Sequence, residues 1–412
     1  MQTPIVPRRV VVTGMGAISP LGRGVNALFA GLKHGKSGIV HVEDMAQVGG
    51  MGPRIAGLVQ GVDVTEVPRK LRRSMSRMSV YAFMAAQEAI AQAGLEDAML
   101  HGGETGLAIG STIGSAENLE FFFNQYLATH SIEQIKSMLF FRIMGHTIAA
   151  NLAQAIGITG RVIAPAAACS TSCQAIGLAY ETIAFGKQNY MLAGGADEFH
   201  ALTAATFDIM KAASTGYNET PQDAPRPFDK DRDGIVCAEG AGILVLEAYD
   251  SAIKRKAPIL AEIRGFATTG DPSSIANPDP YPVYNCMNLA LQNAHLLPED
   301  ISYVNAHATG TPQGDAAEST AIHMLFGNTT PVSSLKGHLG HTMAASGALE
   351  SIASICMMQK NILIPTKNLD TPGQDCSGVL HVPTNDAQLV HTIMKNNFAL
   401  GGINCSLIFG KP

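Results

Sequence analysis

The chain has 412 residues, more than one hydrophobic core usually serves, so two domains or one duplicated domain are expected. A formal net charge of −6 argues against a general nucleic-acid-binding protein, because such proteins are normally basic. The sequence also lacks a run of the ~18 apolar residues that a transmembrane helix requires. Neither nucleic acid nor a membrane is therefore expected as a partner.

Short apolar segments alternate with alanine-rich helical segments along the first half of the chain. The pattern predicts strands within residues 8–14, 105–114, 190–199 and 241–249, and helices over residues 81–95 and 172–186. Such alternation predicts a mostly parallel sheet with helices on both faces.

The second half repeats this rhythm. It predicts a helix over residues 282–296, a strand and loop over 301–315, a helical segment within 330–360 and a strand–loop–strand over 396–410. Each half pairs a glycine-rich loop with a helix of small residues, at 169–186 and at 341–358. We therefore predict an internal duplication, with one half over residues 1–255 and the other over 256–412.

The cysteines and the start of the chain indicate a compartment. The first residues, MQTPIVPRRVVVTGMG, contain only a short apolar stretch and are not expected to form a signal peptide. The seven cysteines are odd in number and scattered along a large chain. This usage predicts reduced thiols and a cytoplasmic location rather than a disulfide framework.

Cys169 lies where a run of small residues meets a predicted helix. Free backbone N–H groups and the positive end of the helix dipole would stabilise a thiolate there and lower the pKa of the thiol. The alternative, for a lone cysteine, is a buried structural residue. Cys173 lies one helical turn further on, where an inert core residue is expected. The spacing of the two suits neither a metal pair nor a redox pair.

Two further segments carry candidate chemistry. NAHATGTPQGD places His307 at the end of a strand, and SSLKGHLGHTMAASG offers Lys336, His338 and His341. No acidic third ligand lies near the last two histidines in sequence, so no metal site is predicted. One cysteine, two histidines and one lysine on loops at strand or helix ends match the place where α/β sheets build their sites.

These segments resemble a known family. AAACSTS, NAHATGTPQGDAAE, SSLKGHLGHTMAASGALES and NNFALGGIN resemble the Cys-His-His signature of β-ketoacyl-acyl-carrier-protein synthases, the condensing enzymes of the thiolase fold. RPFDKDRDGIVCAEGAGILVLE resembles the family's middle block and VVVTGMGAISPLG its start. The resemblance covers essentially the whole chain. It implies a thiolase-like duplicated α/β fold with five α-β-α-β-α layers and mixed, mostly parallel sheets.

The resemblance implies a decarboxylative Claisen condensation. Cys169 would take an acyl group from a carrier protein or coenzyme A as a thioester. His307 and His341, each with a proton on Nε2, would donate to the malonyl thioester oxygen as the enolate forms. The backbone N–H groups of Cys169 and Leu400 would form a second oxyanion hole.

Other positions take supporting roles in the resemblance. Lys336 would lie behind the histidines and tune their protonation, with Glu350 nearby. Thr309 and Thr311 match the hydroxyls that hold the phosphopantetheine arm, and Ile113 matches a position on the floor of the acyl pocket. Phosphopantetheine would arrive on the carrier protein, so the chain would need no cofactor of its own. His338 and Cys173 carry no role.

The resemblance also implies partners. Carrier proteins are acidic, and Arg69, Lys70, Arg72, Arg73 and Arg77 form a basic run whose position resembles the family's docking patch. The alternative is a charged face that is simply solvated. Relatives are dimers, so a homodimer or a heterodimer with a chain-length factor is expected.

Two departures from the family pattern stand near the C-terminus. FALGGIN keeps Phe398, but Ala399 and Leu400 replace a glycine and a bulky phenylalanine, which predicts an altered gate and a different acyl pocket. Lys395 stands where relatives commonly place a small hydroxyl near a bound monovalent cation. Our hypothesis is that its ammonium replaces that ion.

Several alternatives compete with an active ketosynthase. A degradative thiolase needs a second catalytic cysteine near the C-terminus, and Cys405 lies instead in a strand-like segment. A non-catalytic chain-length-setting partner would lack the nucleophile, which Cys169 supplies. A Cys–His hydrolase would need one base and one orienting group rather than two histidines with a lysine behind them. Fatty-acid elongation and a specialised polyene or polyketide pathway both remain open.

Overall fold

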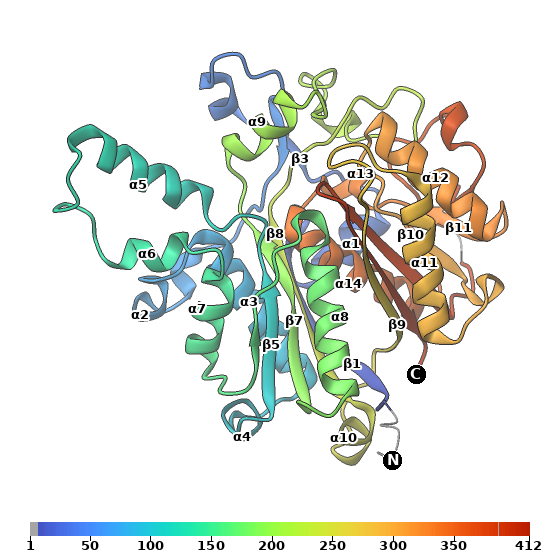
Figure 1. Ribbon diagram of the computed structural model, residues 1–412, viewed down its shortest axis with the longest axis horizontal. Helices are drawn as coiled ribbons and strands as arrows, with labels where there is room; N and C mark the ends of the chain where they lie inside the picture. The colour runs from blue at the N-terminus through green and yellow to red at the C-terminus, as the bar shows by residue number, and fades with distance from the viewer. Residues whose placement is uncertain (1–6, 386) are drawn as a thin grey trace.

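The strands of both halves join in one mixed sheet. The computed structural model describes residues 7–385 and 387–412, and Figure 1 shows its arrangement. In spatial order the main path of the sheet is β12 (Leu380–His381), β11 (Pro331–Ser333), β10 (Tyr303–Asn305), β13 (Thr392–Ala399), β14 (Ile403–Gly410), β9 (Ala261–Gly270), β1 (Val10–Ser19), β8 (Gly240–Ala248), β7 (Tyr190–Asp197), β5 (Thr105–Gly110) and β6 (Val162–Ile163). The short β2 (Gly22–Arg23) pairs with β1, and β3 (Ile39–His41) pairs with β4 (Ile55–Gly57).

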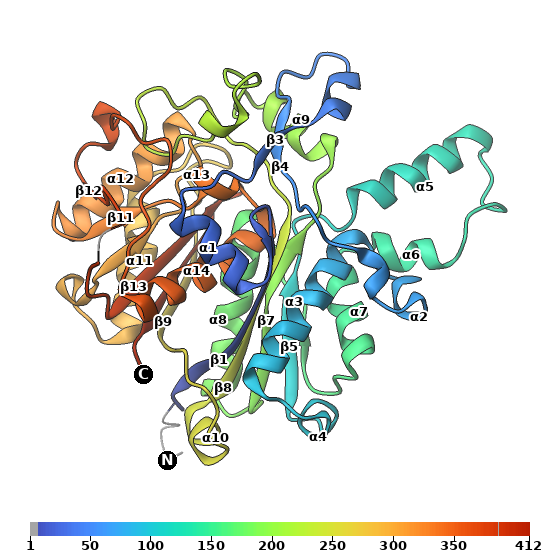
Figure 2. The same ribbon diagram turned by 180° about the vertical axis from the view of Figure 1, so that it is seen from behind.

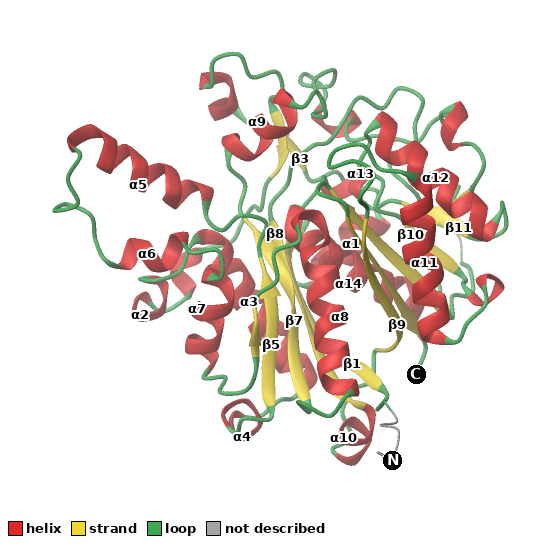
Figure 3. Ribbon diagram, in the orientation of Figure 1, coloured by secondary structure: helices red, strands yellow, loops and turns green. Residues whose placement is uncertain are grey.

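Helices connect and cover these strands, as the colouring in Figure 3 shows. They are α1 (Val25–Lys33), α2 (Arg69–Arg72), α3 (Arg77–Ala93), α4 (Asp97–His101), α5 (Ala116–Thr129), α6 (Met138–Ile143), α7 (Thr147–Ile156), α8 (Thr171–Ala184), α9 (Ala201–Ile209), α10 (Tyr249–Lys254), α11 (Pro280–Ala294), α12 (Pro312–Phe326), α13 (Lys336–Leu339) and α14 (Ser346–Lys360). The helices and strands expected from the sequence are present, with ends that differ by a few residues.

The two halves share one strand topology. The order β6-β5-β7-β8-β1 in the first half matches the order β11-β10-β13-β14-β9 in the second, with the same parallel or antiparallel sense at each step. The first strands of the two halves, β1 and β9, pair with each other along Val10–Val12 and Ala261–Ile263. The division of the chain at residue 255 stays a prediction.

The α/β fold is confirmed, but its sheet is less parallel than the alternation of elements predicted. Parallel pairing is confined to the outer strands, β5 with β6 and β7, and β10–β12 with β13. The central pairs, β7–β8, β8–β1, β1–β9, β9–β14 and β14–β13, are antiparallel. β13 and β14 are joined by a tight turn, which reverses the chain without a crossover helix.

Alternating side chains of the strands divide the core into three layers of apolar contacts. Leu244 and Leu246 of β8 face inward to α8 and α14, whereas Ile243 and Val245 face α3. In the second half Leu407 faces the inner layer and its neighbour Ile408 faces α11 and α12. The molecule therefore has helices outside each half of the sheet and a central layer containing α8 and α14, as the opposite views of Figures 1 and 2 show. This arrangement is the expected five-layer order.

One segment departs from these layers. α5 and α6 extend away from the body, at the left of Figure 1 and the right of Figure 2.

No helix among the described residues is long and apolar enough to cross a membrane. The prediction that no signal peptide begins the chain falls partly on residues 1–6, which lie outside the described residues.

Candidate functional site

The first turns of α8 and α14 meet at the centre of the molecule. Each helix is preceded by a short 3-10 turn, Ala168–Ser170 before α8 and Met343–Ala345 before α14. Gly347 allows the close approach, because a Cβ there would lie 2.6 Å from the backbone nitrogen of Cys173. The Ser172 hydroxyl accepts the N–H of Ala348 at 2.9 Å across the same contact. Residues 169 and 341, far apart in sequence, are thereby brought to one place.

Cys169 lies in the turn before α8 and is buried. Its sulfur and one nitrogen each of His307 and His341 lie within 4.8 Å of one another. Burial raises the pKa of the thiol to about 12, although Lys336 and the backbone N–H groups of Cys169 and Leu400 lower it. The prediction of a lowered pKa is therefore wrong for the resting protein, because the loss of water around the sulfur outweighs the favourable donors.

His307 follows β10 and is held through its backbone and its ring. Glu318, on the second turn of α12, accepts the N–H groups of His307 and Ala308 at 2.8 and 2.7 Å. The Nδ2 of Asn397 lies 3.4 Å from Nδ1 of His307. An amide donor at that position assigns the ring proton to Nε2, as the sequence analysis expects. Burial, followed by the charge of Lys336, places the pKa of His307 well below its usual 6.5, so the ring is neutral.

His341 is held by the middle block of the sequence. Its backbone donates to the carbonyl of Val236 and accepts from Ala238, both at 2.8 Å. Its ring meets that of His307 edge to face, with 5.3 Å between the centroids. Neither ring nitrogen has a hydrogen-bond partner among the described residues, and burial again holds its pKa well below 6.5. A neutral ring with a free N–H is thus available to a ligand.

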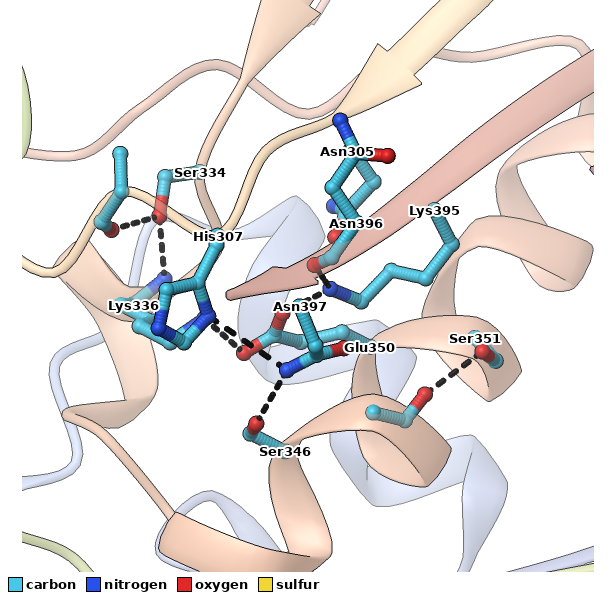
Figure 4. A network of polar contacts seen from close by, with 12 residues as sticks. Asn305, His307, Ser334, Lys336, Ser346, Glu350, Ser351, Lys395, Asn396 and Asn397 are labelled. Carbon is cyan, nitrogen blue, oxygen red and sulfur yellow. Dashed lines mark hydrogen bonds and ion pairs between the residues drawn. The ribbon is translucent and has the colours of Figure 1, made fainter. Parts of the chain in front are cut away.

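A buried group of three charges lies behind the histidines. Glu350 of α14 forms two ion pairs. Its Oε1 lies 2.7 Å from Nζ of Lys336, and its Oε2 lies 2.9 Å from Nζ of Lys395. Figure 4 shows the two lysines on opposite sides of the glutamate. Lys336 therefore lies where the resemblance placed it. The position of Lys395 fits the hypothesis of an internal ammonium in place of a cation, which stays a prediction.

A cavity of about 520 Å³ opens onto Cys169. It is lined by both histidines and by the predicted ligand-binding residues Thr309, Thr311, Phe398 and Leu400. The hydroxyl groups of Thr309 and Thr311 lie 3.2 Å apart. In the loop after β13 the positive φ angles belong to Gly401 and Gly402. The alanine at position 399 therefore causes no backbone strain.

Other predicted residues lie outside this cavity. Ile113 is 56% exposed and lines a separate small hollow with Met343, Asp197 and Glu198. The structure therefore does not place it on the floor of the cavity in the single chain.

The basic run lies on and beside α2. Arg69, Lys70 and Arg73 are exposed, and Arg72 is partly exposed. Arg77 instead begins α3 and lies 3.7 Å from both Glu117 and Glu239, so it belongs to a local charge cluster. None of the five residues lines the cavity.

The residues that were given no role are engaged elsewhere. The two ring nitrogens of His338 lie 3.0 and 3.2 Å from the carbonyls of Lys36 and Pro365. Cys173 is buried in the central core. Cys405 is buried in β14 beside the Thr268 hydroxyl and does not line the cavity, so it does not provide the second catalytic cysteine of a thiolase.

The residues that hold the site together were not predicted from the sequence. Asn397 donates to the Cys169 carbonyl at 3.0 Å and to the Ser346 hydroxyl at 2.9 Å, besides its contact with His307. Asp315 accepts the N–H groups of Thr309 and Gly310. Asp315 lies in the first turn of the helix after His307 and Glu318 lies one turn further on; acidic side chains near the N-terminus of a helix are stabilised by its dipole. That signal was present in GDAAE.

The Cys169, His307 and His341 ligand atoms are also close enough to hold a metal ion. The adjacent group of two lysines and one glutamate carries excess positive charge and opposes a bound cation. The absence of a metal cofactor stays a prediction.

Two family models and the curated relatives match this chain to the same family of proteins. Residues 7–252 match the β-ketoacyl synthase N-terminal domain and residues 260–370 its C-terminal domain. The chain is 36% identical to 3-oxoacyl-[acyl-carrier-protein] synthase 1 of Haemophilus influenzae, over 98% of this chain and 99% of that one.

Solved structures give the same result. A β-ketoacyl synthase from Burkholderia phymatum has a TM-score of 0.95 and 41% identity, covering 98% of this chain and 100% of its own. The ishigamide ketosynthase/chain length factor has a TM-score of 0.91 and 31% identity. A type II PKS acyl-carrier protein in complex with its ketosynthase bound to the hexaketide has a TM-score of 0.91 and 30% identity. Both cover 98% of this chain and 100% of their own.

The thiol of Cys169 offers a direct test of the charge arrangement. Lys336→Met removes the cation that most lowers the pKa of Cys169, while Lys395 still neutralises Glu350. The pKa of the thiol should rise, and alkylation of Cys169 by iodoacetamide at pH 8 should slow about tenfold for each unit of that rise. Mass spectrometry of the Cys169 peptide measures the rate, with Cys169→Ala as the background. An unchanged rate would remove Lys336 from this role.

Proposed function

Because this chain belongs to the β-ketoacyl synthase family, and is therefore a ketosynthase and an acyltransferase, we propose that it condenses an acyl group with malonyl-acyl-carrier protein. The product is a β-ketoacyl-acyl-carrier protein. The observation that carries this proposal is the convergence of the Cys169 sulfur with one nitrogen each of His307 and His341, all within 4.8 Å.

The first half-reaction acylates Cys169. The sulfur attacks the carbonyl carbon of an acyl thioester, its proton passes to the departing thiol, and the phosphopantetheine thiol leaves. The backbone N–H groups of Cys169 and Leu400, which interact with the sulfur in the resting protein, are placed to donate to the oxyanion of the tetrahedral intermediate. Burial raises the pKa of the Cys169 thiol to about 12, so the thiol is protonated in the resting protein and must lose its proton during the attack.

The second half-reaction releases CO₂. Cleavage of the carbon–carbon bond to the malonyl carboxylate leaves its electron pair as an enolate. Nε2–H groups of neutral His307 and His341 would donate to the enolate oxygen. The enolate carbon then attacks the carbonyl carbon of the Cys169 thioester and forms the new carbon–carbon bond. The sulfur leaves as a thiolate, which takes a proton from water to restore the thiol.

The pathway served by this reaction is a finer proposal. The names of curated relatives support fatty-acid elongation. A specialised polyene or polyketide pathway is the second candidate, supported by Leu400 in place of a bulkier gate and by neighbours from such systems.

We propose that the phosphopantetheine arm on the carrier is the only prosthetic group the reaction needs. The seven free thiols support a cytoplasmic location.

Acyl-carrier proteins loaded with saturated or polyunsaturated chains test the assignment of the nucleophile. An acyl adduct should appear on Cys169 by mass spectrometry and disappear in Cys169→Ala. His307→Ala and His341→Ala should still be acylated. Each should lower the rate of CO₂ release from malonyl-carrier protein by about 100-fold or more. An adduct that survives Cys169→Ala, or normal CO₂ release by either histidine variant, would contradict the corresponding role.

We propose the basic run on α2 as the docking patch for the carrier protein. Three of its cations are exposed, and the guanidinium of Arg142 lies beside them, donating to the Arg73 carbonyl. Long-range attraction to an acidic partner speeds encounter and weakens with salt.

The double charge reversal Arg69→Glu/Arg73→Glu tests this docking. It should raise the KM for an acyl-carrier protein about tenfold or more at low salt, with little change for a small acyl thioester. Lys187→Glu, an exposed lysine outside the run, is the matched control. An equal effect of both variants, or no dependence on salt, would show that the run is only a solvated face.

We propose that a second chain of the same fold covers the projecting α5–α6 segment. That segment exposes large apolar side chains which a monomer would leave in water: Phe121, Phe123, Tyr126, Leu127, Ile132, Phe140 and Phe141. Ile113, exposed near its base, would then complete the acyl pocket at the interface.

Light scattering on the purified protein should give twice the mass of one chain, and Phe121→Ser/Phe123→Ser should lower this toward one chain. A monomer in the native protein would contradict the homodimer and favour a heterodimer with a chain-length factor.

A further inference from the structure

Lys395 is a fully buried lysine that the proposed reaction does not use. It lies on β13 with a side-chain exposure of 0%, and its ammonium contacts Glu350 and the carbonyl of Asn396. Glu350 already has an ion pair with Lys336, whose side chain is equally buried. Among the described residues no other carboxylate lies within ion-pair distance of either lysine. With both ammonium groups protonated, the group contains two positive charges and one negative charge. Burial lowers the pKa of Lys336, Glu350 raises it, and Lys395 lowers it further.

Such an excess of buried charge is costly. Removal of an ammonium from water costs several kcal/mol unless close partners compensate for it, and one lysine would suffice to neutralise Glu350. A neutral residue at position 395 would fill the same space without this cost. The second lysine therefore does more than satisfy the glutamate.

The location of the excess charge indicates its use. Lys336 lies directly behind His307, and Lys395 lies on the far side of Glu350, as Figure 4 shows. Asn397, two residues after Lys395 on β13, contacts the ring of His307. One strand thus carries both the second ammonium and the amide that orients the histidine.

We propose that Lys395 is a positioning residue for the condensation, which occupies the second oxygen of Glu350 and keeps the buried group behind the two histidines positively charged. This inference rests on the proposed function, since its effect is exerted on the histidines that donate to the enolate. A cationic group there favours neutral imidazoles over imidazolium and also stabilises negative charge that develops on the substrate.

The surroundings of the histidines agree with this role. Burial is the largest cause of the lowered pKa of both rings, and Lys336 and Lys395 lower it further. His341 also lowers the pKa of His307. On the opposite side lies Glu318, which accepts the N–H of His307. Burial raises the pKa of Glu318, both lysines partly offset this rise, and the net value is about 7. The Cys169 thiol, whose sulfur lies within 4.8 Å of one nitrogen of each ring, is protonated in the resting protein.

The sign of the pH effect follows from these charges. Because the histidine pKa values lie below 6.5, the rings stay neutral as the pH falls through that value, and decarboxylation persists. Lys395→Met removes one positive charge, so the histidine pKa values should rise. The acid limb of the rate of CO₂ release should move to higher pH by about one unit, the lower end of what a nearby charge does to a pKa.

The experiment compares CO₂ release from malonyl-carrier protein between pH 4 and 8 in four proteins. Native protein and Lys360→Met, a change at the exposed end of α14, should share one acid limb. Lys395→Met should shift that limb upward. Lys395→Met/Glu350→Gln, which again holds a single net positive charge on Lys336, should return the limb toward its native position even where its rate is lower.

Acyl loading of Cys169 is measured on the same samples. If native protein is not loaded, the proposed function fails rather than this inference. If Lys395→Met does not fold, Lys395→Gln replaces it, because an amide retains a polar contact with Glu350. The proposal would be overturned if a loaded Lys395 variant had the same acid limb as native protein. It would also be overturned if the acid limb of the double variant were shifted as far as that of the single variant.

Discussion

The site depends on the contact between the first turns of α8 and α14. This contact places the Cys169 turn of one half against the segment that follows His341 in the other. It requires a glycine at position 347, where a Cβ would lie 2.6 Å from the backbone of Cys173. The topology that repeats in the two halves sets these two helices side by side in the central layer. Each half then supplies one part of the chemistry, a thiol from the first and the histidines from the second.

Burial, more than any single partner, decides the protonation states at this contact. It keeps the thiol protonated and both imidazoles neutral. Positive charge favours both a thiolate and a neutral imidazole. The lysine–glutamate–lysine group therefore opposes the effect of burial on the pKa of the thiol and adds to the effect of burial on the pKa of the histidines. The same field therefore serves acyl transfer and decarboxylation.

Much of the fold and site was predictable from the sequence because the chemistry is carried by short motifs. Cys169, His307 and His341 each lie in a segment of small residues, and the alternation of strands and helices indicated the layers. The antiparallel centre of the sheet was not predictable in this way, because a strand buried on both faces has the same apolar pattern in either sense. The pKa of Cys169 was misjudged because its burial comes from β13, β14 and α14, which are distant in sequence. Glu318 and Asn397 were missed because they act on the backbone and on another side chain rather than on a ligand.

In the proposed mechanism the acyl thioester oxygen meets the backbone N–H groups of Cys169 and Leu400, and the malonyl thioester oxygen meets the two histidines. A crystal structure of the protein acylated at Cys169 would test it most directly. The account predicts that the acyl carbonyl oxygen lies between the N–H groups of Cys169 and Leu400, about 2.7–3.1 Å from each, with both histidines still open to the cavity. A carbonyl oxygen bound instead by His307 or His341 would contradict it.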